Sequence, residues 1–122
     1  MEKKYELIKT YSESYYIIAL KDFTLITGEQ IKKGDLGGFV KSEDCLSQDG
    51  LCWVMYGACV YGKVSGNAVV KFPAEVYGTV SENAVVQDDV EIKQNAIVTG
   101  NAVIKDSAIV EGTVSGNAVV QD

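Results

Sequence analysis

The sequence predicts an all-β, single-domain fold: a parallel β-helix of about five triangular coils, preceded by an N-terminal β-hairpin. Three observations predict it. The sixteen residues 58–73 are repeated at 74–89 with ten identical positions. The run Asn-Ala-Val-Val within each copy recurs, with conservative changes, at 95–98, 101–104, 107–110 and 117–120. From residue 40 onward, small and aliphatic residues alternate in units of about six. A short repeat of this kind is typical of stacked structural units.

Each six-residue unit predicts one short strand and one turn. In a strand, a small residue and the aliphatic residue two positions later point to the same side, so both are buried. Gly and Asn in the following positions tolerate left-handed backbone values and suit a turn. Three such units close one triangular coil of 18 residues. We number the three sides of each coil in chain order as its first, second (middle) and third face.

The register of the coils can be assigned from the repeat. We assign coils to 40–57, 58–73, 74–89, 90–107 and 108–122, of which the first is the least regular. The shorter coils lack two residues on their middle face, as in Val64-Ser-Gly-Asn67. Removing two residues preserves the inward and outward alternation. Stacking in this register places four amides at one corner as a ladder: Asn67, Asn83, Asn101 and Asn117.

The segment before the repeat predicts a cap. Residues 3–9 and 15–20 have strand composition and flank the polar residues 10–14, which favours a hairpin. Residues 23–26 predict a short third strand, and the glycine-containing stretch 28–38 predicts a loop. The chain therefore divides into a cap, residues 1–39, and a β-helix, residues 40–122.

Composition excludes several classes of function. The chain has no His, all 11 basic residues are Lys, and the formal net charge is −6. It therefore lacks the commonest general base and the bidentate group favoured for phosphate, and it would repel nucleic acid. No apolar run is long enough to span a membrane and the first residues lack the apolar core of a signal peptide, so we expect a cytoplasmic protein.

The three cysteines predict neither a disulfide framework nor a metal site. Their odd number fits reduced thiols, and their seven-residue spacing matches no standard zinc pattern. Cys52 occupies an inward position where the repeat has a small residue, Cys59 an outward position and Cys45 a corner. We expect no metal, no cofactor and no catalytic residue.

The repeat and several flanking motifs resemble a known superfamily. The hexapeptide pattern resembles left-handed parallel β-helix proteins, best known as acyltransferases. The block KGDLGGFVKSE at 33–43, GLCWV at 50–54 and YIIALKDF at 16–23 resemble small bacterial and prophage β-helix proteins, mostly uncharacterised. Left-handedness is implied by this resemblance alone. The superfamily's acyltransferases typically use a His as base, and this sequence has none to fill that role.

Outward positions on the third face predict an apolar stripe. In five successive coils these positions carry Trp53, Val69, Val85, Val103 and Val119. Contiguous exposed apolar residues usually mark an interface. Two alternatives remain: these valines are present only because valine favours strands, or the N-terminal hairpin folds down over part of the stripe.

Two further groups complete the predicted binding surface. Tyr61 and Tyr77 stack on the first face, for recognition or for cross-strand stability. Asp88 and Asp89 form an acidic corner. The last coil carries no capping segment, so we expect a homo-oligomer, with a dimer favoured.

Three functional hypotheses follow. The first is a non-enzymatic scaffold that binds a host protein, in a narrower version a phage-encoded inhibitor of a defence effector such as a CRISPR effector. The second is a divergent acyltransferase with a carboxylate base. The third is a structural module of a larger assembly.

Overall fold

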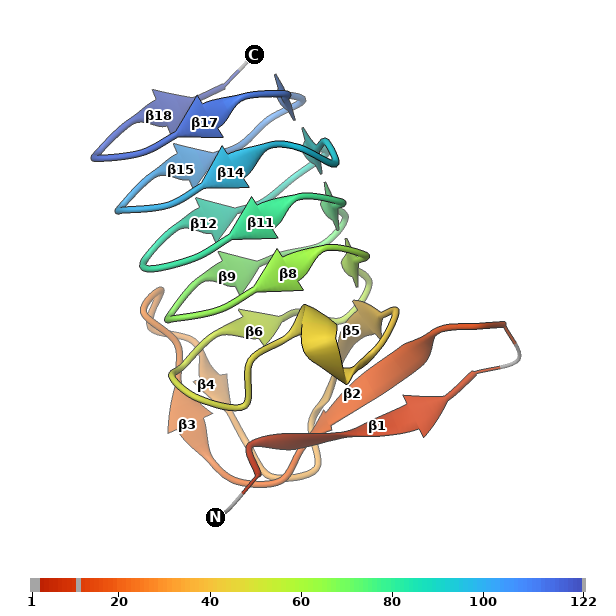
Figure 1. Cartoon of the computed structure of the whole chain (residues 1–122). Helices are drawn as coiled ribbons and strands as arrows, with labels where there is room; N and C mark the ends of the chain where they lie inside the picture. Colours follow the sequence, from red (N-terminus) through yellow and green to blue (C-terminus); the bar gives the residue numbers. More distant parts are fainter. Residues whose placement is uncertain (1–2, 11, 122) are drawn as a thin grey trace.

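The computed structural model describes residues 3–10 and 12–121, which form a three-sided prism of stacked coils resting on an N-terminal cap (Figure 1). Each side of the prism is a sheet. The first contains β1 (Tyr5–Lys9), β2 (Tyr15–Ala19), β5 (Leu36–Val40), β7 (Cys59–Val60), β10 (Glu75–Val76), β13 (Glu91–Ile92) and β16 (Ile109–Val110). The second contains β8 (Lys63–Val64), β11 (Thr79–Val80), β14 (Ile97–Val98) and β17 (Thr113–Val114). The third contains β6 (Trp53–Val54), β9 (Val69–Val70), β12 (Val85–Val86), β15 (Val103–Ile104) and β18 (Val119–Val120).

The pairing within the prism confirms the predicted parallel β-helix of about five coils. Cys59 pairs with Glu75, Glu75 with Glu91 and Glu91 with Ile109, so two coils advance by 16 residues and the third by 18. The first coil is longer, because Phe39 pairs with Cys59, and it carries the short 3₁₀ helix η1 (Glu43–Cys45). Handedness stays the prediction that the resemblance implies.

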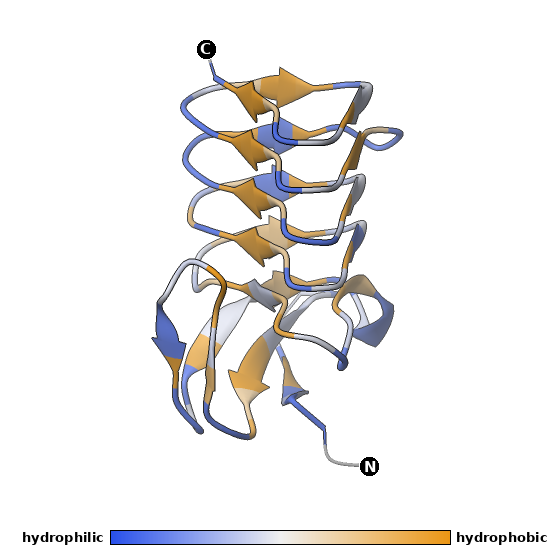
Figure 2. Ribbon diagram, turned by 90° about the vertical axis from the view of Figure 1, so that its left-hand side faces the viewer, coloured by the Kyte–Doolittle hydropathy of each residue, from blue (hydrophilic) through white to orange (hydrophobic). Residues whose placement is uncertain are grey.

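The core consists of small and branched residues in columns that run along the prism axis. On the third sheet, Ala68, Ala84 and Ala102 form one fully buried column, and Val70, Val86 and Ile104 form the next. Each buried Val contributes about 1.5–3 kcal/mol relative to an exposed one. Figure 2 shows the result: apolar strands in every coil, joined by polar turns.

One corner of the prism is held by two further columns. The amides of the predicted ladder are hydrogen-bonded: Asn67 Nδ2 donates to Asn83 Oδ1 at 3.1 Å, Asn83 to Asn101 at 3.2 Å and Asn101 to Asn117 at 3.0 Å. Beside the ladder lies a column of residues with positive φ: Gly50, Gly66, Glu82, Gly100 and Gly116. The turn therefore requires a left-handed residue in every coil.

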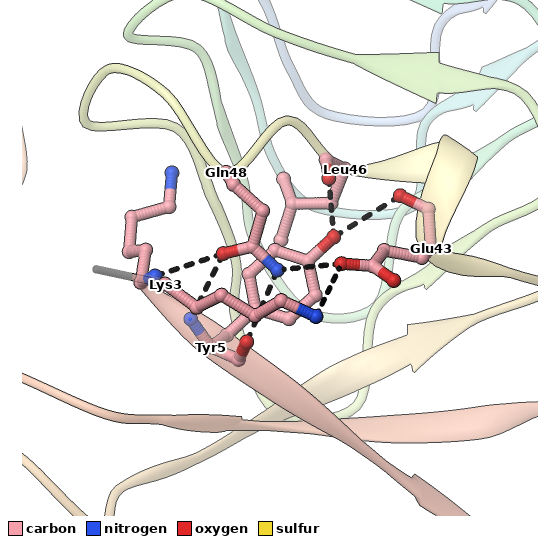
Figure 3. A network of polar contacts seen from close by, with 6 residues as sticks. Lys3, Tyr5, Glu43, Leu46 and Gln48 are labelled. Atoms are coloured by element: carbon pink, nitrogen blue, oxygen red, sulfur yellow. Dashed lines mark hydrogen bonds and ion pairs between the residues drawn. The ribbon is translucent and has the colours of Figure 1, made fainter. Parts of the chain in front are cut away.

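The first sheet changes direction where the cap joins the prism. β1 and β2 are antiparallel, β2 and β5 are antiparallel, and β5 then starts the parallel pairing with β7. The free edge of β1 is partly covered by the side chain of Gln48, which accepts from Tyr5 N at 3.2 Å and donates to Tyr5 O at 3.1 Å (Figure 3). The side-chain amide of Gln48 thus makes the two backbone hydrogen bonds with Tyr5 that a residue of a neighbouring strand would otherwise make.

Tyr5 joins the cap to the first coil. Its side chain is fully buried, and its hydroxyl donates to Leu46 O and to Glu43 O (Figure 3). Burial, and then the nearby Glu43 carboxylate, hold the pKa of this phenol well above its ordinary value. The hydroxyl therefore remains a hydrogen-bond donor.

The stretch 28–38 is not simply a loop, as the sequence suggested. It contains β4 (Gln30–Ile31), which pairs antiparallel with β3 (Phe23–Thr24) in a separate two-stranded sheet, and also the first residues of β5. Leu25 and Ile31 from this β3–β4 hairpin are buried. The hairpin therefore packs against the prism as a second part of the cap.

Candidate protein-binding surface

The two residues of the predicted apolar stripe that lie nearest to the cap are not exposed. Trp53 is 1% exposed and Val69 is fully buried, which corrects the prediction for these two residues. The β3–β4 hairpin provides the cover: the Phe23 ring lies 5.3 Å from the Trp53 ring, edge to face, and Lys71 Nζ lies 3.1 Å from Glu29 Oε1. Part of the stripe is therefore covered, as one alternative expected, but chiefly by the β3–β4 hairpin rather than by the N-terminal hairpin of residues 3–9 and 15–20, whose Tyr5 ring lies 6.4 Å from the Trp53 ring.

The three residues of the apolar stripe that lie further from the cap remain accessible. Val85 and Val103 are partly exposed, and Val119 is 57% exposed. Three valines on three short strands form a smaller apolar surface than the five residues expected. The third face is therefore the weaker candidate.

Tyr61 and Tyr77 stack as the sequence predicted. Their ring centroids lie 5.0 Å apart with an interplanar angle of 13°, and the side chains are 44% and 38% exposed. Both residues directly follow strands of the first sheet, so they line one edge of the first face, by which we mean the outer surface of that sheet. Partial burial, together with nearby thiol and carboxyl groups, raises the pKa of both phenols.

A second aromatic group, which the sequence did not predict, lies on the opposite edge of the first face and at its cap end, where Phe39 pairs with Cys59 of the central row. The ring of Tyr16 lies 4.3 Å from Phe39 and stacks at 6.1 Å, nearly parallel, on Tyr56. Phe72 is 65% exposed, and its ring lies directly on the backbone of Gly57. We call Tyr16, Phe39, Tyr56 and Phe72 the aromatic corner. Tyr56 and Phe72 occupy equivalent positions in adjacent coils, and this is the one sequence signal for the group.

An open hollow of about 490 Å³ adjoins the aromatic corner. It is lined by Ile8, Lys9, Thr10, Ser12, Tyr16 and Phe39. Ile8, on β1, is 41% exposed, and Leu36, on β5 at the far side of β2, is 42% exposed. Apolar walls with lysine and hydroxyl groups beside them suit an apolar side chain of a partner that also offers hydrogen-bond acceptors.

The centre of the first face is acidic and carries one thiol. Between the two aromatic edges lie Cys59, Glu75 and Glu91, which pair in register along the sheet. Glu91 also forms an ion pair with Lys93 at 3.0 Å. Burial, followed by the Glu75 carboxylate, raises the pKa of the partly exposed Cys59 thiol. This thiol is therefore a weak nucleophile at neutral pH.

The predicted acidic corner continues the aromatic corner along the prism. Asp88 and Asp106 occupy, in the next two coils, the position of Tyr56 and Phe72. Asp88 Oδ2 accepts from the backbone N of Asp106 at 3.1 Å, so one of its oxygens supports the turn. Asp89 is exposed. Partner contacts by Asp88 would therefore involve its second oxygen.

Charge is distributed unequally between cap and prism. Residues 1–39 contain six lysines and six carboxylates, whereas residues 40–122 contain five lysines and eleven carboxylates. The formal net charge of −6 thus belongs to the prism. Within residues 3–10 and 12–121, no group of three or more Cys, Asp or Glu side chains could hold a metal ion, and no helix is long and apolar enough to cross a membrane.

No protein-family model matches the chain, and no curated protein sequence matches it significantly.

Proposed function

We propose that this protein is a non-enzymatic scaffold that binds another protein through its first face. The observation that supports this most is the presence of two aromatic groups, Tyr61/Tyr77 and the aromatic corner, on one sheet. The exposed members are Tyr56 and Phe72 at one edge and Tyr61 and Tyr77 at the other. Tyr and Phe are enriched in protein interfaces, and exposed aromatic clusters are uncommon on surfaces without a partner.

The chemistry of the face defines the partner. Aromatic edges suit apolar side chains, and the carboxylates Glu75 and Glu91 between them, with Asp89 beyond, suit lysine or arginine. We therefore propose a partner with a basic surface that carries apolar residues. Its association rate should fall as salt concentration rises, because the electrostatic contribution is screened.

The test is capture of the partner by purified protein in which single side chains are changed. We expect Phe72→Lys and Tyr61→Lys to weaken capture at least tenfold. Ile97→Lys is the matched control, because Ile97 is 44% exposed but lies on the second face. Val85→Lys tests the alternative third-face surface. Equal capture by the wild type, Phe72→Lys and Tyr61→Lys would overturn the proposal.

Protection of Cys59 supplies an independent measurement. Its thiol lies between the aromatic edges and is partly exposed, so a partner on this face would shield it from alkylation. We expect Cys59 to be alkylated more slowly in the complex than in the free protein. An unchanged rate would place the partner elsewhere.

The resemblance to prophage proteins adds a narrower proposal, that the partner is a host defence effector whose nucleic-acid groove is blocked. A competition experiment tests this narrower proposal, because added nucleic acid should displace the protein from its partner. Titration with coenzyme A separates the acyltransferase alternative, which requires saturable binding, whereas the scaffold proposal expects none.

A further inference from the structure

Lys4 is a buried lysine whose amine lies against a thiol. Its side chain is 1% exposed, and Cys52 is fully buried. Lys4 Nζ donates to Cys52 O at 2.6 Å, to Gly50 O at 3.3 Å and to Cys52 Sγ at 3.3 Å. Lys4 precedes the N-terminal strand and Cys52 belongs to the first coil, 48 residues later in the sequence. The contact between the Lys4 amine and the Cys52 sulfur therefore joins these two parts of the molecule.

The thiol is not required for packing at this position. In the later coils the residue that stacks above Cys52 is alanine: Ala68, Ala84, Ala102 and Ala118. Three of these alanines are fully buried, so the site accepts a methyl group. The sulfur of Cys52 is therefore an addition to the repeat, and it is placed within reach of the lysine amine.

Burial shifts the pKa of both groups. It lowers the pKa of Lys4, an effect that the nearby Cys52 partly opposes. It raises the pKa of the Cys52 thiol, which Lys4 opposes in turn. A lowered lysine pKa increases the share of neutral amine, the form with a free electron pair. The distance of 3.3 Å between Nζ and Sγ is that of two atoms positioned to react.

The geometry points to an oxidative modification site in which Lys4 Nζ and Cys52 Sγ become joined by a covalent S–N bond. A peroxide is the oxidant. The neutral amine of Lys4, 3.3 Å from the sulfur, takes the thiol proton, which gives Cys52 a base that Cys59 lacks within the described part of the chain. The sulfur then attacks one peroxide oxygen, the O–O bond breaks, and the released oxygen leaves as water with the proton that the amine returns. This gives a sulfenic acid, which condenses with nitrogen nucleophiles.

The second step uses the lysine. The neutral amine attacks the sulfur, the S–O bond breaks, and the departing hydroxide takes a proton from nitrogen and leaves as a second water. One peroxide is reduced and the sulfur is oxidised by two electrons. The product has lost two hydrogen atoms. It fixes residue 4 to residue 52 and so locks the cap to the first coil.

The experiment exposes the full chain to hydrogen peroxide and measures its mass. We expect a loss of about 2 Da that dithiothreitol reverses, whereas simple oxidation adds about 16 Da per oxygen. Trypsin should then release residues 4–9 linked to residues 42–63, because a substituted Lys4 is no longer cleaved. All three cysteines lie in the second peptide, so fragmentation must assign the bond to Cys52.

Three variants make the result specific. Cys52→Ala should fold, as the alanine column indicates, and should give no linked peptide. Cys45→Ala and Cys59→Ala should retain the link. The urea midpoint of the wild type should rise after peroxide and return after dithiothreitol, while that of Cys52→Ala stays constant.

Two outcomes would overturn the proposal. One is a Cys52 that stays reduced, or gains only oxygen, after the more exposed Cys59 has been oxidised. The other is a linked product about 14 Da heavier than the reduced protein, because the link would then contain one oxygen atom and would not be the simple S–N bond.

Discussion

Glu82 has a backbone conformation that suits glycine. Its φ is 59°, and the residues at the same corner of the coils below and above, Gly66 and Gly100, have φ of 68° and 73°. The coils stack closely here, since a Cβ on Gly66 would lie 2.8 Å from the backbone N of Glu82. A side chain in the left-handed region costs about 1–2 kcal/mol.

Glu82→Gly should therefore stabilise the protein by about 0.5–1 kcal/mol, because the relief of strain exceeds the added entropy of the unfolded chain. Urea unfolding measures it. Glu75→Gly is the control and should destabilise, since Glu75 lies in β10. A lower stability for Glu82→Gly would show that the turn is not strained.

The Cys59 thiol predicts a pH dependence. Burial and then the Glu75 carboxylate raise its pKa, so less thiolate is present at pH 8 than in a free peptide. Glu75→Gln removes the negative charge, lowers the pKa and should increase the alkylation rate at pH 8 roughly two- to threefold. Glu91→Gln is the matched control, one coil further away. Equal rates for wild type and Glu75→Gln would contradict the assigned cause.

At the scale of the elements, the asparagine ladder links strands that are only two residues long. Such short strands offer few backbone bonds each, so side-chain bonds between turns add to the cohesion of neighbouring coils. Asn83 takes part in two ladder bonds, to Asn67 and to Asn101, whereas Asn117 accepts one from Asn101.

Asn83→Ala should destabilise the protein by about 1 kcal/mol, because two amide bonds are lost at a solvent-accessible corner. Asn117→Ala should cost about half as much. Thermal unfolding of both variants tests the difference. If Asn117→Ala lowered the stability more than Asn83→Ala, the contributions of the ladder hydrogen bonds to stability would not be additive along the prism.

The repeating elements were predictable from sequence, and the cap was less so. Coil boundaries, the shortened middle face and the ladder follow from alternation that each coil repeats, so one coil checks the next. The β3–β4 hairpin has no repeat, and its strands contain two residues each. Its cover over Trp53 and Val69 depends on tertiary packing of Phe23 and Leu25, which local patterns do not encode.

The aromatic corner escaped prediction for a related reason. Tyr16 and Phe39 belong to the cap, whereas Tyr56 and Phe72 belong to turns of the prism. They meet because β2 and β5 extend the first sheet beyond the first coil. Tyr61 and Tyr77, by contrast, are one repeat apart and were predictable. Likewise, nothing in the sequence around Lys4 indicated that its amine would be buried.

At the scale of the whole molecule, the two ends of the prism differ. The cap covers the first coil, where Val54 is fully buried. In the coil of residues 108–121, Ile109 and Val119 are 60% and 57% exposed, and Val114 and Val120 are only partly buried. An open hollow there is lined by Ser107, Ala108, Ile109, Val120 and Gln121. This surface is a candidate for self-association.

The predicted homo-oligomer is tested by the mass in solution. We expect a dimer at tens of micromolar by light scattering. The double variant Ile109→Lys/Val119→Lys should be monomeric, because two buried charges would oppose contact. Ile97→Lys should remain dimeric. A monomeric mass for the wild type would contradict the prediction.

The even spacing between coils also makes this fold adjustable in length. Each coil of the prism beyond the first advances the chain by 16 or 18 residues, so equivalent residues keep their direction whichever coil they occupy. If residues 74–89 were removed, residue 73 would take the place of residue 89 and would be joined to residue 90 at the same corner of the prism. The product should be a shorter version of the same molecule, reduced by about 4.8 Å, one sheet spacing. Such a series of lengths would measure how far along the prism a bound partner extends.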